Sequence, residues 1–220
     1  MIKLAIFDCD GTLVDSGATI HAALQQAFGA HGIECPPQEV ARKVIGLSLD
    51  EAMAVLVPDA DHAALSRTYK DAFFAMRGAG RVEEPLFDGI VELLDRLEGD
   101  GWLLGVATGK SERGLRHCLD SHGLGGRFVT LQTADRNPSK PHPAMVLAAM
   151  AEARAEPSRT IFVGDTGWDM GCARGAGVGA IGAGWGYHEV EELTAEGAHA
   201  VALEPAEVLD IAGGWIGREV

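Results

Sequence analysis

Residues 1–16, MIKLAIFDCDGTLVDS, decide the fold prediction because an apolar run there ends in two acids. The run before Asp8 is nearly continuous, which is typical of a strand buried on both faces of a parallel sheet. Asp8 and Asp10 follow its carboxyl end. Gly11 and Thr12 then permit a tight turn with free backbone N–H groups. Ligands of open α/β sheets bind beyond the strand ends, so the stretch indicates a ligand site, although an ordinary acidic turn uses the same residue types.

After residue 85 the chain alternates strand and helix patterns, which predicts a doubly wound parallel α/β sheet. Apolar runs indicate further strands at 103–107, 128–131, 160–163, 178–181 and 200–203. Helices are expected between them, including 90–97 and 144–153. The stretch 15–84 shows only helical periodicity, enough for a bundle of four helices. We therefore expect one core domain built from 1–14 and 85–220, interrupted by a helical cap subdomain at 15–84.

Capping residues mark the helices of this inserted segment. Pro37 stands where a helix-opening proline belongs. Ser48 and Glu51 have the spacing of a capping box. Asp61 is placed to cap the last and longest helix.

The composition limits the classes of function. With 220 residues, of which 47% are hydrophobic and 23% charged, the chain can bury a full core and an inserted subdomain. Its net charge of −14 repels nucleic acids and anionic membranes, so neither is expected as a principal partner. Four scattered cysteines are expected to be reduced, buried thiols: Cys9, Cys35, Cys118 and Cys172. A cytoplasmic location is expected because we find neither a signal-peptide pattern nor an apolar run of about 18 residues. The residues do not indicate an oligomeric state.

Further polar groups fall at later strand ends or in the loops beyond them. The Thr108 hydroxyl and the Gly109 N–H can bind a phosphate oxygen, or form a plain helix-capping turn. Lys140 lies in the proline-held loop SKPHP, which fixes its ammonium unless it is a solvated surface charge. Asp165 and Asp169 stand four residues apart across a turn, so they either face one point or cap a helix. The joint occurrence of these groups favours a site.

In their order along the chain, these groups resemble the four motifs of the haloacid dehalogenase superfamily. The motifs are DCDGT at 8–12, Thr108, KPHP at 140–143 and GDTGWD at 164–169, and the resemblance covers essentially the whole chain. The helical insertion after the first motif is similar to the subgroup capped at that position. DGTLVDS, KPHP and WGYH at 185–188 are similar to phosphoglycolate phosphatases. The resemblance implies a Rossmann-like core and, as for most members, phosphatase activity.

The implied reaction is Mg²⁺-dependent hydrolysis of a phosphomonoester through an aspartyl-phosphate. Asp8 is the implied nucleophile, and Asp10 the group that protonates the leaving alkoxide and then activates water. The implied Mg²⁺ ligands are the side chains of Asp8 and Asp165 and the backbone carbonyl of Asp10. Asp169 is expected in that ligand shell or just outside it.

The resemblance also implies the substrate contacts. Thr108 and Gly109 are expected to hold the phosphate oxygens, and Lys140 to neutralise the nucleophile and the phosphoryl group. Arg42 and Lys43 precede the loop where capped relatives place substrate-selecting residues, so they are candidate substrate contacts, although a solvated helix face also explains them. The expected substrate is a small phosphorylated metabolite, with 2-phosphoglycolate the first candidate.

Alternatives remain at this point. Dehalogenases and phosphonate hydrolases of the superfamily lack an acid at the position of Asp10, which argues against both, since an ester leaving group needs a proton donor. A sugar phosphomutase with the same motifs and the same type of cap stays open. So does a catalytically idle protein that binds a phosphorylated ligand.

Overall fold

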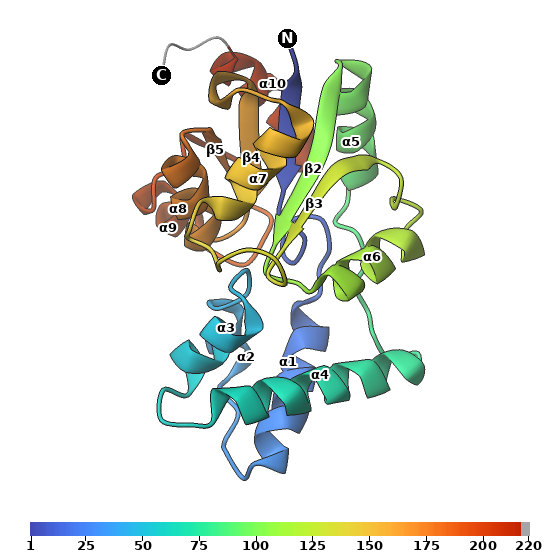
Figure 1. The fold of residues 1–220 in the computed structure, drawn as a ribbon, viewed down its shortest axis with the longest axis vertical. Helices are drawn as coiled ribbons and strands as arrows, with labels where there is room; N and C mark the ends of the chain where they lie inside the picture. Colours follow the sequence, from blue (N-terminus) through green and yellow to red (C-terminus); the bar gives the residue numbers. More distant parts are fainter. Residues whose placement is uncertain (217–220) are drawn as a thin grey trace.

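A six-stranded parallel sheet organises the computed structural model, which describes residues 1–216 (Figure 1). The strand order is β3-β2-β1-β4-β5-β6. The strands are β1 (Lys3–Phe7), β2 (Trp102–Thr108), β3 (Phe128–Thr133), β4 (Thr160–Gly164), β5 (Gly179–Ala183) and β6 (Ala200–Ala202). The doubly wound parallel fold expected from the sequence is confirmed, and the first strand lies at its centre, between β2 and β4.

The continuous apolar run of β1 is explained by two hydrophobic cores, one on each face of the sheet. Ala5 and Phe7 face one core, and Leu4 and Ile6 face the other. The first core is covered by α5 (Ile90–Gly99), α6 (Glu112–Ser121) and α10 (Val208–Trp215), and the second by α7 (Ala144–Ala153), α8 (Gly167–Ala176) and α9 (Val190–Ala195). Two short 3₁₀ helices, η1 (Pro157–Arg159) and η2 (Pro205–Glu207), directly precede β4 and α10.

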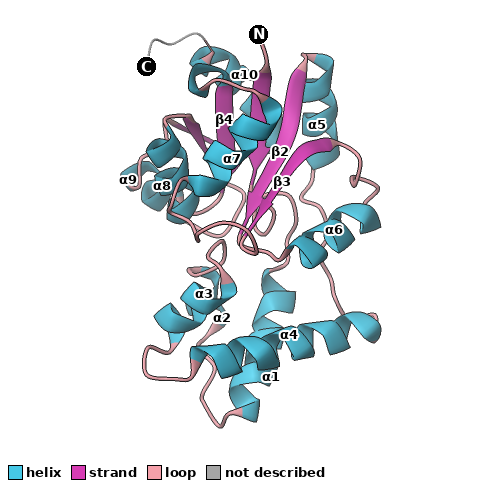
Figure 2. Cartoon of the chain, in the orientation of Figure 1, coloured by secondary structure: helices cyan, strands magenta, loops and turns pink. Residues whose placement is uncertain are grey.

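Four helices lie beyond the carboxyl edge of the sheet, and no strand lies among them (Figure 2). They are α1 (Gly17–Ala30), α2 (Gln38–Arg42), α3 (Leu49–Leu56) and α4 (His62–Gly78). These helices enclose a hydrophobic cluster of their own, formed by Leu24, Ala27, Phe28, Ala41, Met53 and Leu65. Two linkers join these helices to the sheet, the first at Asp15 and the second at Pro85. The two linkers are hydrogen-bonded to each other, since the Asp15 N–H donates to Pro85 O at 2.8 Å.

The capping expectations are only partly confirmed. The Asp61 side chain accepts from the Ala64 N–H at the start of α4, as expected. The capping box at Ser48 is wrong, because the Ser48 side chain makes no capping hydrogen bond. The backbone N–H of Ser48, which Glu51 was expected to bind, donates instead to Ser139 Oγ at 2.8 Å. A contact with the loop before α7 thus replaces the local one.

The cysteine expectation holds with one exception. All four thiols are free, but Cys35 is only half-buried. Cys35 packs against the hydrophobic cluster of the four helices but does not belong to its buried members. Within residues 1–216, no helix is both long and apolar enough to cross a membrane.

Candidate active site

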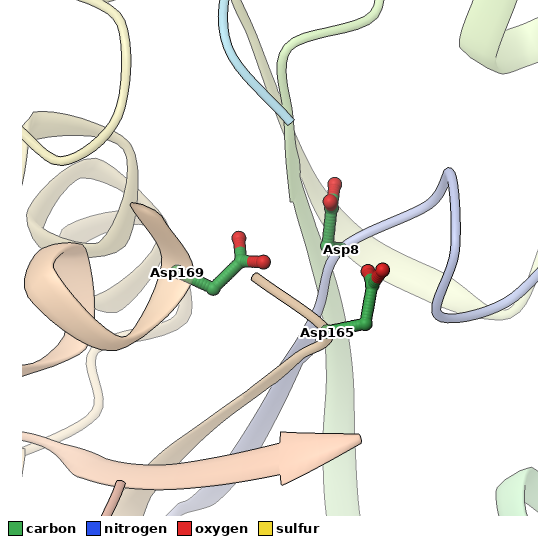
Figure 3. Close-up of side chains that lie close together, drawn as sticks. All are labelled: Asp8, Asp165 and Asp169. Carbon is green, nitrogen blue, oxygen red and sulfur yellow. The ribbon is translucent and has the colours of Figure 1, made fainter. Parts of the chain in front are cut away.

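Three acids gather where the two central strands end. Asp8 follows β1 and Asp165 follows β4, and the pairing of Phe7 with Val163 places these two acids side by side. Asp169 reaches the same point from the first turn of α8 (Figure 3). One carboxylate oxygen from each acid lies within 4.8 Å of the others, and all three side chains are buried. The structure therefore brings together three of the four acids expected from the sequence.

The orientation of Asp165 is fixed by the turn after β1 and by the loop after β5. The Thr12 hydroxyl donates to Asp165 Oδ1 at 2.8 Å, and the Tyr187 N–H donates to Oδ2 at 3.0 Å. The Trp185 indole N–H donates to the Thr12 carbonyl at 3.0 Å and holds this turn. Gly11 has a φ of +88°, and a Cβ there would lie 2.2 Å from Asp165 Oδ2. The glycine of the first motif is thus required by close approach as well as by conformation.

Lys140 is buried within this group. Its Nζ lies 2.9 Å from Asp8 Oδ1 and 2.6 Å from Asp169 Oδ1. The second Asp169 oxygen accepts from the N–H of Thr166 at 3.0 Å and from its hydroxyl at 2.7 Å, in the capping box of α8. Both oxygens of Asp169 are therefore bonded to the protein. Asp8 Oδ2, in contrast, is buried and has no hydrogen-bond partner within residues 1–216.

Asp8, Asp165, Asp169 and Lys140 form what we term the Asp8 cluster, and its charges do not balance. Burial raises the pKa of Asp8 to about 7, against the opposing effect of Lys140. Burial and the two neighbouring acids hold the pKa of Asp165 well above its usual value. Burial disfavours the Lys140 ammonium, but Asp169 and Asp8 outweigh it and keep the pKa raised. The cluster thus holds three carboxylates and one ammonium, and among the described residues the Asp8 Oδ2 oxygen has no partner. Such a donor set suits a hard divalent cation.

Asp10 belongs to a second group of charges, which the sequence analysis did not find. The Ser16 hydroxyl donates to Asp10 Oδ1 at 2.5 Å, and Lys110 Nζ lies 2.6 Å from the same oxygen. Lys110 also lies 2.9 Å from Glu84 Oε1, and Arg77 of α4 lies 3.2 Å from Glu84 Oε2. Asp10, Lys110, Glu84 and Arg77 form what we term the Asp10 cluster. It joins the expected acid to the second linker and to α4.

Two signals pointed toward the Asp10 cluster. Lys110 stands two residues after Thr108, so the strand-end argument that selected Thr108 applies to it as well. Glu84 lies at the end of the helical segment, where the chain must return to the sheet. Both side chains are largely buried, and buried charges are normally paired.

The phosphate-binding candidates lie beneath a loop from the helical group. Thr108 ends β2 and is buried. A Cβ on Gly109 would lie 2.2 Å from the Leu47 carbonyl, so only glycine permits this approach. A Cβ on Gly46 would lie 3.7 Å from Asp8 Oδ2. The loop at residues 46–48 therefore sits directly over the free oxygen of Asp8.

Arg42 and Lys43 lie apart from these groups. The Arg42 guanidinium lies 5.4 Å from the ring of Tyr187, and Lys43 Nζ lies 2.5 Å from Glu192 Oε1 on the exposed side of α9. The reason is that α2 ends at Arg42, so the two cations face the loop after β5 and α9. Neither belongs to the described residues that line a cavity of about 540 Å³ between the helical group and the sheet.

Comparisons with known proteins agree with this architecture. Residues 5–183 match the family model described as haloacid dehalogenase-like hydrolase. The chain is 36% identical over 216 residues to a protein named probable phosphatase IndB of Dickeya dadantii, across 96% of this chain and 90% of that protein. It is 29% identical over 220 residues to a phosphoglycolate phosphatase of Vibrio parahaemolyticus, across 96% of each. A haloacid dehalogenase-like family protein from Streptococcus pneumoniae has a TM-score of 0.84 and 26% identity, across 96% of this chain and 98% of that one.

Proposed function

This chain belongs to the haloacid dehalogenase-like hydrolase family, and from this premise we propose that it is a Mg²⁺-dependent phosphomonoester hydrolase working through an aspartyl-phosphate. The observation that carries the proposal is the free, buried Oδ2 of Asp8 within an unbalanced group of acids. A similar protein is named a probable phosphatase, which supports the same class. We take 1–14 and 85–220 as the core domain and 15–84 as the cap subdomain.

In this proposal Asp8 is the nucleophile. Its Oδ1 accepts from the Cys9 N–H at 2.6 Å and contacts Lys140, so the carboxylate is held in one orientation. Oδ2 is then free to attack phosphorus and form the acyl phosphate. Lys140 offsets the charge that Asp8 and the phosphoryl oxygens share, while the Thr108 hydroxyl and the Gly109 N–H hold those oxygens. The loop at residues 46–48 covers the reacting atoms and excludes water.

The donor set fits Mg²⁺. Asp8, Asp165 and the backbone carbonyl of Asp10 would hold the ion, since oxygen ligands are those that Mg²⁺ prefers. Asp169 is assigned a place outside the ligand shell, because one of its oxygens contacts the Lys140 ammonium and the other accepts two hydrogen bonds from Thr166. Each oxygen of Asp165, in contrast, accepts one hydrogen bond from a neutral donor and keeps a lone pair for the ion. When bound, Mg²⁺ supplies charge neutralisation between the carboxylates and the phosphate dianion.

Asp10 is the proposed acid and base. Its side chain lines the cavity between cap and core, where the leaving group of a phosphate at Asp8 must lie. Ser16 and Lys110 hold one of its oxygens, which orients the carboxyl group toward that cavity. Asp10 can therefore give a proton to the departing alkoxide and later take one from the water that attacks the acyl phosphate.

The substrate class is proposed as a small phosphorylated metabolite. The similarity to a protein named phosphoglycolate phosphatase makes 2-phosphoglycolate the reference substrate against which larger esters are compared. The volume of the cavity argues for a larger leaving group. A cytoplasmic location and the absence of nucleic-acid and membrane partners stay predictions from the sequence.

Rapid-quench kinetics of the Asp10→Asn variant test this proposal. With an alkyl phosphate, kcat is expected to fall by about 10²–10⁴, the usual loss for a positioned acid or base. With 4-nitrophenyl phosphate, whose leaving group departs without a proton, we expect a burst of nitrophenol, slow turnover and a phosphate adduct on Asp8 by mass spectrometry. Asp59→Asn, at an exposed acid of the cap, is the matched control. Parental activity of Asp10→Asn on the alkyl substrate would remove Asp10 from the mechanism. Absence of any adduct would leave Asp8 unsupported as the nucleophile.

A further inference from the structure

The cavity of about 540 Å³ lies directly beyond Asp10. It is lined by residues of all four helices of the cap, by the loop at residues 44–48 and by the loops after β2 and β3 of the core. Asp10 and Lys110 belong to its lining, so a leaving group that takes its proton from Asp10 must extend into this space. The size and lining of the cavity therefore describe the leaving group.

The cap supplies apolar walls. Ile20 and Leu24 of α1, Leu56 of α3, and Tyr69 and Phe73 of α4 all line the cavity. The two aromatic rings stand 5.9 Å apart with an interplanar angle of 39°, so they present a tilted pair of ring faces and edges. Aromatic and aliphatic walls of this kind gain free energy from a hydrophobic body and little from a polar one.

The positive charges nearest Asp10 are already paired. Lys110 contacts both Asp10 and Glu84, and Arg77 contacts Glu84. Lys70 and Arg113 also belong to the lining, but Lys70 is exposed and the Arg113 guanidinium lies 4.9 Å from the ring of Phe74. The two cations beside Asp10, Lys110 and Arg77, are thus already engaged by carboxylates, and the carboxylate of a two-carbon acid held close to Asp10 would have to compete with Asp10 and Glu84 for them.

We propose that the leaving group of the substrate is a bulky alcohol with an apolar, ring-bearing body that packs on Phe73 and Tyr69. This inference rests on the proposed hydrolase function and specifies its substrate class. The cavity volume falls within the range of about 300–1,000 Å³ that accommodates drug-sized ligands. A two-carbon leaving group fills a small part of it and leaves the apolar walls uncovered. Selection by the cap thus depends on burial of the ring.

Three primary phosphate esters test this inference: 2-phosphoglycolate, ethyl phosphate and 2-phenylethyl phosphate. In all three esters the leaving group is a primary alcohol, so the esters differ mainly in the part of that alcohol that enters the cavity. We expect kcat/KM for 2-phenylethyl phosphate to exceed the other two by at least about tenfold, as a pocket that covers several apolar carbons can discriminate. A value for 2-phosphoglycolate equal to or above that for 2-phenylethyl phosphate overturns the inference.

Variants locate the discrimination in the cap. Phe73→Ala is expected to lower the preference for 2-phenylethyl over ethyl phosphate by about tenfold. Val55→Ala, at a residue of α3 that is 54% exposed and outside the cavity lining, is expected to keep the parental preference. An unchanged preference in Phe73→Ala, with unfolding temperature and circular dichroism like the parent, contradicts the inference.

Calorimetry with the Asp8→Asn variant separates this inference from the proposed function. The variant lacks the nucleophile, so Kd values for 2-phenylethyl and ethyl phosphate are measured without turnover. Binding of 2-phenylethyl phosphate that is at least about tenfold tighter supports the inference, whether or not the parent hydrolyses these esters. Failure of the parent to hydrolyse any ester would overturn the proposed function alone. Equal binding of the two esters overturns the inference even where hydrolysis is observed.

Discussion

Two buried groups of charge lie at the carboxyl edge of the sheet, and they differ in balance. The Asp8 cluster holds three carboxylates around the Lys140 ammonium, and Asp8 Oδ2 has no hydrogen-bond partner in the part of the chain that the structure describes. The Asp10 cluster holds two carboxylates, Asp10 and Glu84, and two cations, Lys110 and Arg77. Unpaired buried charge is costly, whereas paired and hydrogen-bonded charge is tolerated. The first cluster is therefore suited to bind a cation, and the second to position a carboxyl group without one.

The largest expected effect comes from breaking the unbalanced cluster. Asp165→Ala, or removal of Mg²⁺ with EDTA, should lower kcat/KM on any phosphomonoester by about 10³-fold, which corresponds to about 4 kcal/mol of lost transition-state stabilisation. Steady-state release of phosphate measures the loss. The control variant Asp59→Ala removes an exposed aspartate of the cap, and its kcat/KM should stay near that of the parent. Full hydrolysis in EDTA would show that the acids of the Asp8 cluster act without a metal.

Breaking the balanced cluster should have a smaller effect. Lys110→Met removes the ammonium 2.6 Å from Asp10, so the acid loses its fixed position, and kcat on ethyl phosphate should fall about 10- to 100-fold. The burst with 4-nitrophenyl phosphate should be less affected, because that leaving group needs no acid. Arg116→Met, which removes only an exposed pair with Glu112, should change neither rate. Equal losses on both substrates would show that Lys110 does not act through Asp10.

The charge imbalance of the Asp8 cluster also predicts how the free energy of unfolding depends on pH. Because burial raises the pKa of Asp8 from 3.8 to about 7, the folded protein binds a proton there that the unfolded chain releases. Its contribution to the free energy of unfolding thus falls as the pH rises from about 4 to about 7, and stays low above that. In metal-free buffer at pH 7.5, Asp8→Asn should therefore stabilise the protein by about 1–3 kcal/mol, or roughly 2–10 °C in Tm. The stabilisation of Asp8→Asn relative to the parent should decrease toward pH 4. A variant less stable than the parent at pH 7.5 would contradict the charge imbalance.

The smallest expected effect is at the contact between cap and core. Ser139→Ala removes the acceptor of the Ser48 N–H, so the loop over Asp8 should close less tightly. Loss of one such hydrogen bond corresponds to about 0.5–1.5 kcal/mol, so KM should rise about 2- to 10-fold with a smaller change in kcat. Ser121→Ala, whose hydroxyl bonds within α6, is the control. An unchanged KM would show that this contact does not hold the loop.

The sequence predicted the Asp8 cluster because each member follows a strand, stands in a rigid loop or lies in the first turn of the helix after a strand. Parallel strands end at one edge, so Asp8 and Asp165 were expected at the same edge of the sheet. Their direct proximity follows from the pairing of β1 with β4, which the sequence analysis did not predict. The structural interpretation of Asp169 as a capping acid also proved correct, since it forms the capping box with Thr166. Both interpretations of this residue hold, because one oxygen caps the helix and the other binds Lys140.

The sequence pattern could not predict the Asp10 cluster or the contacts of the cap, because these contacts join residues that meet only in the folded chain. Glu84 reaches Lys110 only when the second linker folds back beside the first, and no spacing along the chain encodes that approach. Arg77 joins the cluster through Glu84. Arg42 and Lys43 were predicted as substrate contacts from their nearness to the loop at 46–48, and this role stays a prediction. Their side chains extend toward Tyr187 and Glu192 and do not line the cavity. Side-chain direction after a short helix depends on tertiary contacts, which sequence periodicity does not report.

Calorimetric titration with Mg²⁺ tests most directly whether the unbalanced cluster is the metal site. The parent protein should bind one ion per chain, and Asp165→Asn should show no saturable heat. Lys110→Met should bind Mg²⁺ like the parent, because the Asp10 cluster contributes no side-chain ligand. Absence of saturable binding in the parent, or equal binding by the parent and Asp165→Asn, would contradict the assignment of the Asp8 cluster as the metal site.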